Sequence, residues 1–162
     1  MNSPARKTDA DIERVYREYA DMLYRLALTY MHSREDAEDA VHDAYVSYMR
    51  KAPAFDSGDH EKAWLCRVTV NKCRDALRRR TLRTHASLDD ITELAIADEI
   101  PADISSALGS LPEKLRVCVT LHYLEGFSVE EVAKIVGSTV PAVKMRLLRA
   151  RERLRTELGR EE

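Results

Sequence analysis

The amino-acid sequence predicts an all-α protein of two small helical domains joined by a flexible acidic linker, and three observations support this. Charged residues make up 33% of the 162 residues and aromatics only 6%, with five glycines and five prolines, a composition that favours helices over strands. Apolar residues recur at steps of three and four over most of the chain. Residues 84–104 contain six acidic residues and no Lys or Arg, which predicts a linker over 81–104 between domains at 1–80 and 105–162.

Length and composition exclude several classes of protein. No apolar run approaches the length of about 18 residues that a transmembrane helix needs, and the polar stretch 1–10 has no apolar signal-peptide segment behind it. Three cysteines without close pairing are typical of a reduced protein, so a cytoplasmic location is expected.

The first domain is expected to contain three helices, over residues 11–31, 34–52 and 60–80. The apolar stripe of the first consists of Ile12, Val15, Tyr16, Tyr19, Leu23, Leu26, Ala27 and Tyr30. Ser33 is a suitable N-cap for the second, and Pro53 ends it. The expected buried face of the second is Ala37, Ala40, Val41, Ala44, Tyr45 and Tyr48.

The second domain has three helix starts. Ser110 with Glu113 reads as a capping box that opens a helix to Glu125, and Ser128 with Glu131 reads as another that opens a short helix to Val136. After a glycine-containing turn, a last helix starts near Pro141. Its expected buried face is Val143, Leu147, Ala150, Leu154 and Leu158.

The last two helices form a predicted helix-turn-helix, a motif that places its second helix in the DNA major groove. Residues 141–155 carry six basic residues and one acidic residue. An ordinary helical hairpin with a solvated basic face is the alternative, but such a face normally interleaves both signs of charge. The pattern therefore favours DNA binding.

The third helix and the loop before it combine aromatic and basic residues, which suits single-stranded nucleic acid because bases stack on rings while cations contact phosphates. Phe55 lies in a polar loop over 53–59 and is the better stacking candidate. Trp64 taken alone is more readily explained as a core residue.

Metal binding and catalysis have little support. Cys66 and Cys73 lie two helical turns apart, too far to share a zinc ion, and Cys118 is expected in the core. Asp89 and Asp90 lie in the linker without a base or pocket, so no catalytic residue, cofactor or small-molecule substrate is expected. The remaining alternative is a DNA-binding regulator that acts alone and binds duplex DNA without a partner.

Several separated motifs, taken together and in order, resemble the extracytoplasmic-function (ECF) subgroup of bacterial sigma-70 family factors over residues 11–158. These motifs are Asp36 to Val41 (DAEDAV), Trp64 to Val68 (WLCRV) with Asn71 and Asp75, Leu111-Pro112, Gly126-Phe127-Ser128, Glu131-Val132-Ala133 and Arg149-Ala150-Arg151.

The resemblance implies a non-enzymatic factor whose partners are core RNA polymerase and promoter DNA. The first domain would be region 2, which binds the polymerase clamp and opens the −10 element, and the second would be region 4, which reads the −35 element. The linker of 24 residues could span about 80 Å when extended, enough for two elements about 50–55 Å apart along B-DNA. An acidic connector also suits a path through the RNA exit channel of the polymerase.

The resemblance also assigns expected contact residues. Those for the polymerase clamp are Asp36, Glu38, Asp39 and Asp43. Those for the −10 element are Phe55, Trp64, Asn71, Lys72, Arg74 and Arg78, with the Phe55 ring and the Asn71 amide holding a flipped-out base. Those for the −35 element are Lys144, Met145 and Leu148 at base-facing positions, Arg146 and Arg149 at phosphates, and Arg151.

One departure affects the expected −35 contacts. Relatives commonly carry Gly-Thr-Val-Lys-Ser-Arg where this chain has PAVKMR at residues 141–146. Two hydroxyl contacts are lost, and Met145 would offer an apolar contact to a thymine methyl instead. Finally, the resemblance implies an anti-sigma factor that covers both domains and holds the protein inactive.

Overall fold

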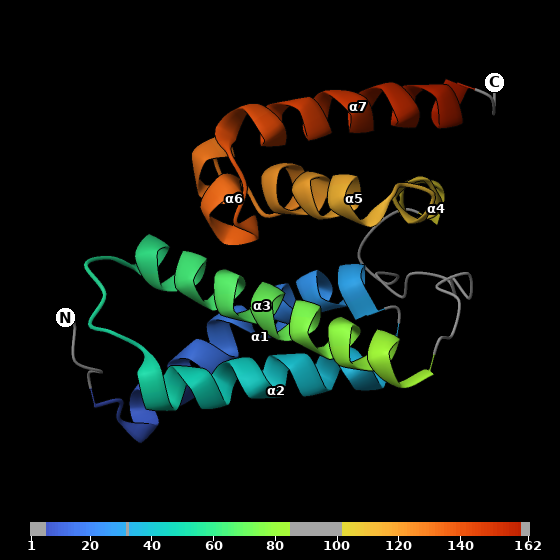
Figure 1. Ribbon diagram of the computed structural model, residues 1–162. Helices are drawn as coiled ribbons and strands as arrows, with labels where there is room; N and C mark the ends of the chain where they lie inside the picture. The colour runs from blue at the N-terminus through green and yellow to red at the C-terminus, as the bar shows by residue number, and fades with distance from the viewer. Residues whose placement is uncertain (1–5, 32, 85–101, 160–162) are drawn as a thin grey trace.

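The computed structural model describes residues 6–31, 33–84 and 102–159, and over these residues the chain folds into helices without strands (Figure 1). The helices are α1 (Asp9–Met31), α2 (Arg34–Lys51), α3 (Gly58–Thr84), α4 (Ala102–Gly109), α5 (Glu113–Val119), the π-helical turn η1 (Thr120–Leu124), α6 (Val129–Val136) and α7 (Val140–Gly159). The predicted all-α class with two helical domains is confirmed. Most of the predicted linker, 85–101, lies outside the described residues. None of the described helices is long and apolar enough to cross a membrane.

Helices α1, α2 and α3 form one bundle, in which each helix packs against the other two. The first starts two residues earlier than predicted, because Thr8 and Asp11 cap it reciprocally, with N–H to side-chain distances of 3.0 and 3.1 Å. The predicted cap of α2 is confirmed, since the Ser33 hydroxyl oxygen accepts from the Asp36 N–H. Tyr16, expected in the buried stripe, is 62% exposed and lies over the Tyr45 ring at the bundle's edge.

The third helix is longer than predicted at both ends. Ser57 sets its start, because the Ser57 hydroxyl oxygen accepts from the His60 N–H at 3.1 Å and so satisfies an unpaired donor of the first turn. It continues past the three arginines to Thr84. Most of the predicted face of α2 and the inward face of α3 are fully buried in this bundle.

Helices α4 to α7 form a second bundle, in which α5 and α7 lie side by side (Figure 1). The capping box at Ser110 and Glu113 is wrong: the Ser110 hydroxyl donates to the Ala107 carbonyl at 2.7 Å and so closes α4, a helix that was not predicted. Pro112 is the N-cap of α5 and makes no side-chain capping bond. The second box is confirmed, with Ser128 and Glu131 bonding each other's backbone N–H.

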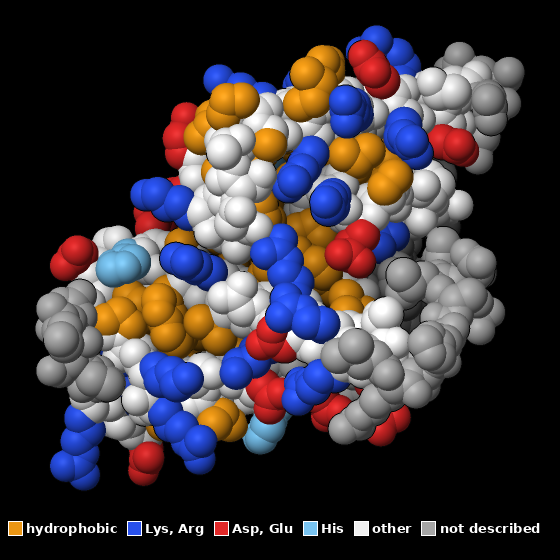
Figure 2. All heavy atoms as spheres, in the orientation of Figure 1, with side chains coloured by type: hydrophobic (Ala, Val, Ile, Leu, Met, Phe, Trp, Pro, Cys, Tyr) orange, Lys and Arg blue, Asp and Glu red, His pale blue; other side chains and the backbone are white. Residues whose placement is uncertain are grey.

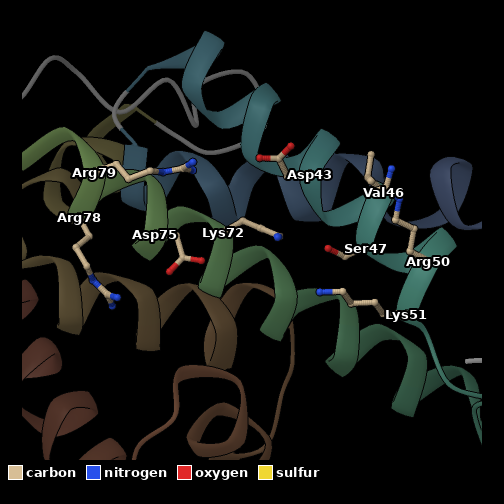
Figure 3. A pocket seen from close by; sticks show the side chains of 9 residues that line it. All are labelled: Asp43, Val46, Ser47, Arg50, Lys51, Lys72, Asp75, Arg78 and Arg79. Atoms are coloured by element: carbon tan, nitrogen blue, oxygen red, sulfur yellow. The ribbon is translucent and has the colours of Figure 1, made fainter. Parts of the chain in front are cut away.

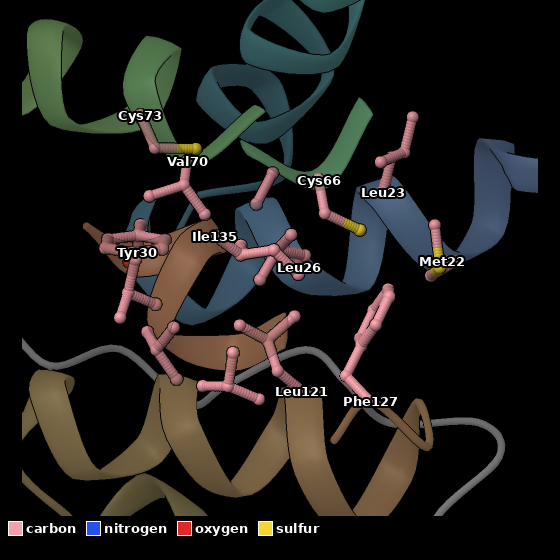
Figure 4. Close-up of a cluster of buried hydrophobic side chains, with 14 of the residues drawn as sticks. Met22, Leu23, Leu26, Tyr30, Cys66, Val70, Cys73, Leu121, Phe127 and Ile135 are labelled. Atoms are coloured by element: carbon pink, nitrogen blue, oxygen red, sulfur yellow. The ribbon is translucent and has the colours of Figure 1, made fainter. Parts of the chain in front are cut away.

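The two bundles dock against each other and share one continuous apolar core. Figure 4 shows the contact: Ile135, Leu121 and Phe127 of the second bundle face Leu26 and Val70 of the first. All five residues are at most 5% exposed. The pattern of the sequence predicted two separate cores, and the structure adds a buried interface between them, called the docking interface below.

Candidate nucleic-acid interface

The outward face of α3 carries the predicted −10 residues. Asn71 and Arg78 are exposed and lie seven residues, or two turns, apart, so both side chains point away from the bundle. Lys72 is half-buried and turned toward α2, where it lines a groove between the two helices (Figure 3). Arg74 is half-buried on the side of the second bundle. This face therefore offers one amide and several cations to a nucleic acid.

The groove between α2 and α3 brings the predicted polymerase contacts next to the predicted −10 contacts. Its volume is about 540 Å³, and it continues into a second groove along the same two helices. Asp43, Lys72 and Arg79 line both grooves. Figure 3 shows the lining residues Asp43, Val46, Ser47, Arg50, Lys51, Lys72, Asp75, Arg78 and Arg79. Carboxylates and cations therefore share this surface.

The acidic residues of α2 differ in how they are engaged. Glu38, Asp39 and Asp43 are exposed, whereas Asp36 is half-buried and pairs with the Arg80 guanidinium at 3.3 Å. Both side chains of that pair are more than a third exposed, so solvent screens it and it adds little stability. The exposed carboxylates can reach a partner without any rearrangement of the helix.

Phe55 belongs to an aromatic cluster at the start of α3. Its ring centroid lies 5.8 Å from that of Trp64, 5.1 Å from that of His60 and 6.3 Å from that of Tyr48, to which it is nearly parallel at 10°. Phe55 and Trp64 are both half-buried and pack against the core. The sequence placed Phe55 in the open, and the structure places it among rings that fix its orientation.

A buried carboxylate supports this cluster from below. Glu61 is 5% exposed and accepts two hydrogen bonds of 2.9 Å from the Arg14 guanidinium. It accepts a third of 2.9 Å from the Tyr48 hydroxyl. Burial acts to raise the pKa of Glu61, but the hydrogen bonds from Arg14 and Tyr48 outweigh it, so the pKa lies below its ordinary value. The carboxylate is therefore charged at neutral pH and fixes the first turn of α3 to α1 and α2.

The outer face of α7 carries the predicted −35 residues. Lys144, Met145, Leu148 and Arg149 are exposed on successive turns. Arg151 is exposed as well, and its guanidinium donates to the Tyr123 hydroxyl oxygen at 3.1 Å. Figure 2 shows Lys and Arg side chains interspersed with apolar patches on one side of the second bundle.

Arg146 is the exception on α7, because it is half-buried. Burial raises the pKa of the Cys118 thiol, and a hydrogen bond from Arg146 opposes that rise, so the guanidinium lies against the thiol. The helix-turn-helix turn itself is tight, since Gly137 adopts a left-handed conformation with φ of 69° that side chains disfavour.

Comparison with known families identifies both bundles. The family described as "Sigma-70 region 2" matches residues 15–83, and the family described as "Sigma-70, region 4" matches residues 102–154. The chain is 34% identical over 150 residues to the ECF RNA polymerase sigma factor SigM of Mycobacterium tuberculosis, covering 91% of this chain and 76% of that protein. The chain belongs to the ECF sigma factors of the sigma-70 family.

Other relatives agree with this assignment. The ECF RNA polymerase sigma factor SigE of Mycolicibacterium smegmatis is 32% identical over 159 residues, and the match covers 91% of this chain but only 62% of that protein's length. The sigma factor RpoE of Bartonella quintana, solved with the anti-sigma factor NepR, superposes with a TM-score of 0.71 at 26% identity, covering 92% of this chain and 97% of that one. CnrH, solved with the cytosolic domain of CnrY, gives a TM-score of 0.63 at 25% identity, covering 96% and 92%. Sigma factors of this family are transcription initiation factors and not enzymes.

The docking interface between region 2 and region 4 has three polar anchors besides its apolar core. The Arg116 guanidinium of region 4 is 3% exposed and donates to the Thr29 carbonyl through Nε at 3.2 Å and Nη2 at 2.9 Å. That carbonyl lies in the last turn of α1, where helix carbonyls lack intrahelical partners. Arg25 pairs with the Glu125 carboxylate at 3.1 Å. The Lys62 ammonium donates to the Glu125 carbonyl at 3.2 Å and lies over the Phe127 ring at 4.7 Å.

Docking brings the helix-turn-helix of region 4 against the −10 helix of region 2. The Nη1 atom of Arg74 lies 3.9 Å from the point that a Cβ at Gly137 would occupy. Gly137 directly precedes the turn into the −35 helix, α7. The turn of the helix-turn-helix and α3 are thus in contact at this point.

Sequence reasoning missed the residues that hold these surfaces in place, namely Lys7, Arg14, Glu61, Arg116 and Glu125. Each pairs with a residue at least 46 positions away, so no local pattern could reveal the partner. Two signals were nevertheless present. Glu61 is one of only two acids in the basic segment 60–83, and Arg116 is the one charge within the mostly apolar run 115–121.

Proposed function

We propose that this chain binds core RNA polymerase and directs it to promoters, reading a melted −10 strand with region 2 and a duplex −35 element with region 4. One observation carries the proposal: two nucleic-acid surfaces of different kinds lie on two separate bundles. The aromatic cluster beside the α3 cations suits unpaired bases, whereas a helix-turn-helix suits the duplex major groove. A protein that binds only duplex DNA needs only the helix-turn-helix.

In region 2, the amide of Asn71 reads one flipped base by its edge, and the Phe55 ring packs on the face of that base. Lys72, Arg74 and Arg78 contact the phosphates of the same strand, and Trp64 holds the Phe55 ring in place. The exposure of Asn71 and the fixed orientation of Phe55 support these roles. A ring of fixed orientation in the loop before α3 and an exposed amide on α3 support a base-specific contact.

In region 4, Lys144, Met145 and Leu148 face the bases of the −35 element, and Arg149 and Arg151 contact its phosphates. Arg146 was expected at a phosphate as well, and its half-buried position favours a larger part in the packing of α7. Met145 is 47% exposed and Leu148 is 44% exposed, which suits apolar contact with thymine methyl groups.

The polymerase clamp binds α2 through Asp36, Glu38, Asp39 and Asp43. Because Asp36 holds Arg80 and Asp43 shares its groove with Lys72 and Arg79, these carboxylates offset the charge of the −10 cations. Polymerase binding to the carboxylates removes that offset. DNA binding by the free chain is accordingly weak, and it strengthens in the complex.

Promoter binding requires the docking interface to open. The −10 and −35 elements lie about 50 Å apart along B-DNA, whereas the α7 turn and α3 touch in the docked protein. Region 2 covers residues 1–80 and region 4 covers 105–162, so the intervening residues 81–104 must bridge the elements.

The protein acts in the cytoplasm, where an anti-sigma factor covers both regions and keeps it inactive. Two proteins of known structure that resemble this chain were solved as complexes: RpoE with the anti-sigma factor NepR, and CnrH with the cytosolic domain of CnrY. Affinity capture from the native cell under non-inducing conditions tests this. The tagged chain should return with one stoichiometric partner other than polymerase, and recovery of free chain would contradict it.

Run-off transcription with purified core polymerase tests the proposed function directly. Adding the chain should produce transcripts from discrete start sites, preceded by shared −10 and −35 sequences. The alternative, a regulator that acts alone, predicts tight specific binding to duplex DNA that is the same with and without polymerase. That result, together with no new start sites, would overturn the proposal.

A further inference from the structure

Lys7, which precedes α1, reaches across to the loop between α2 and α3. Its ammonium donates to the Pro53 carbonyl at 3.1 Å, although the two residues are 46 positions apart. The same ammonium lies over the Phe55 ring, 4.8 Å from its centroid, and over the Tyr48 ring, 5.1 Å from its centroid. One side chain therefore ties the loop and covers aromatic faces of the cluster.

The position of this cation matters because a ring face accepts either a cation or a stacked base. Both interactions use the electron-rich face of the ring. While the Lys7 ammonium lies over Phe55, a base cannot occupy that face. The rings of Trp64 and His60 also pack against the Phe55 ring, with planes at 65° and 89° to it, and the Tyr48 ring lies nearly parallel to it at 10°.

We propose that Lys7 covers the base-stacking face of Phe55 in the free protein and moves to a phosphate of the −10 strand when the flipped base takes its place. This inference rests on the proposed function of the aromatic cluster. A cation over a part-exposed ring is held less strongly than a stacked base, so the base displaces it. The displaced ammonium then lies beside the strand that carries the base, where a phosphate replaces the ring as its partner.

This role separates Lys7 from an ordinary loop anchor. An anchor would hold the Pro53 carbonyl in both states and would make no contact with the strand. A cation that moves to a phosphate displaces a counterion, which appears as a steeper loss of affinity with salt. The slope of log affinity against log salt therefore distinguishes the two roles.

The test uses holoenzyme, assembled from core polymerase and the full chain, and a fluorescein-labelled single strand that carries the −10 sequence found by start-site mapping. Binding is followed by anisotropy between 50 and 200 mM salt for wild type, Lys7→Met, Lys7→Arg and Lys114→Met. Lys114 is an exposed lysine of region 4, so its variant controls for the loss of one charge. Thermal melting by circular dichroism verifies that each variant folds.

For Lys7→Met we expect the slope to fall by about 0.7, so that wild type loses about 2.6-fold more affinity than the variant over this salt range. Lys7→Arg should keep the wild-type slope, because a guanidinium also binds both ring and phosphate. Lys114→Met should keep it as well. The proposal would be overturned if Lys7→Met had the same salt slope as wild type. It would also be overturned if Lys7→Arg lowered the slope as much as Lys7→Met does.

The two proposals fail in different ways. If wild-type holoenzyme binds the −10 strand no better than a scrambled strand, the proposed function of the cluster is wrong and the role of Lys7 is wrong with it. If wild type prefers the −10 strand but Lys7→Met has the same salt slope as wild type, the proposed function stands and Lys7 is a loop anchor.

Discussion

Region 2 and region 4 differ in how they hold the side chains that we propose to read DNA. In region 2 the ring of Phe55 is fixed by three other rings, and an ion pair between Arg14 and the buried Glu61 supports them. In region 4 the corresponding side chains of α7 are exposed on one helix and few have partners. A flipped base needs a preformed site, whereas a helix that enters the major groove needs only the right side chains along one face.

The same difference explains which features of the two regions could be predicted from the sequence. The −35 helix follows from local rules: the capping box and the turn glycine are confirmed, and so are Val143, Leu147 and Ala150 of the predicted stripe. The end of the stripe is wrong, because Leu154 is only half-buried and Leu158 is 41% exposed. The four predictions below address the comparison, from the largest expected effect to the smallest.

The docking interface gives the largest expected effect. Arg116→Ala should lower the free energy of unfolding by about 4 kcal/mol, because it leaves the Thr29 and Leu111 carbonyls buried without their charged donor and opens a cavity. Urea unfolding followed by Trp64 fluorescence reports region 2, and far-UV circular dichroism reports the whole chain. The two transitions should coincide in wild type and separate in the variant. Arg153→Ala, at an exposed position, should change little, and an equally small effect of Arg116→Ala would contradict the docked arrangement.

The support beneath the aromatic cluster should give the next largest effect. Glu61→Gln should cost about 2–3 kcal/mol at pH 7, because Arg14 loses its charged partner and Tyr48 keeps only a weaker acceptor. Since the folded pKa of Glu61 is lowered, its contribution is complete above the unfolded value of about 4.3 and is lost as the pH falls through the folded value. Urea titrations of wild type and variant should therefore converge as the pH falls below the lowered folded pKa of Glu61.

Glu18→Gln is the matched control for that prediction, because Glu18 pairs with the same arginine at 3.4 Å but its side chain is 49% exposed. Its effect should stay within a few tenths of a kcal/mol. If both variants lose the same stability at pH 7, burial does not distinguish the two carboxylates and the preformed site loses its physical basis.

Base reading by region 2 should be specific to one position. Asn71→Ala should cost about 1–3 kcal/mol at a single base of the −10 strand and leave other positions unchanged. The measurement is competition between −10 strands, each altered at one base, for holoenzyme on a pre-melted template. A uniform loss across all positions would show that Asn71 contacts the backbone and not a base.

Phosphate contact by region 4 should be uniform and small. Arg149→Ala should reduce the salt slope of −35 duplex binding by about 0.9, with a loss below about 1 kcal/mol that does not depend on sequence. Filter binding of holoenzyme to duplexes with matched and altered −35 elements measures both. A loss confined to one sequence would assign Arg149 to base reading.

The sequence predicted the helices and the exposed reading residues because these depend on residues within a turn or two of each other. It did not predict α4, since the Ser110 hydroxyl bonds backward to Ala107 and not forward to the next helix. It predicted Phe55 as exposed because loop polarity is local, whereas the rings that surround it come from two helices. The docking interface escaped prediction for the same reason: its anchors join residues from 63 to 100 positions apart.

The distance between region 2 and region 4, in the free protein and at the promoter, tests the central claim most directly. Spin labels at Thr81→Cys and Thr156→Cys lie on exposed positions of α3 and α7. All three native cysteines are buried, which raises the pKa of Cys66 and of Cys73 to about 12, raises that of Cys118 as well, and so slows their labelling. The account predicts one narrow distance distribution in the free chain, set by the docked bundles, and a distance tens of ångströms longer in the promoter complex, as reading surfaces about 50 Å apart require. The same distance in both states would contradict it.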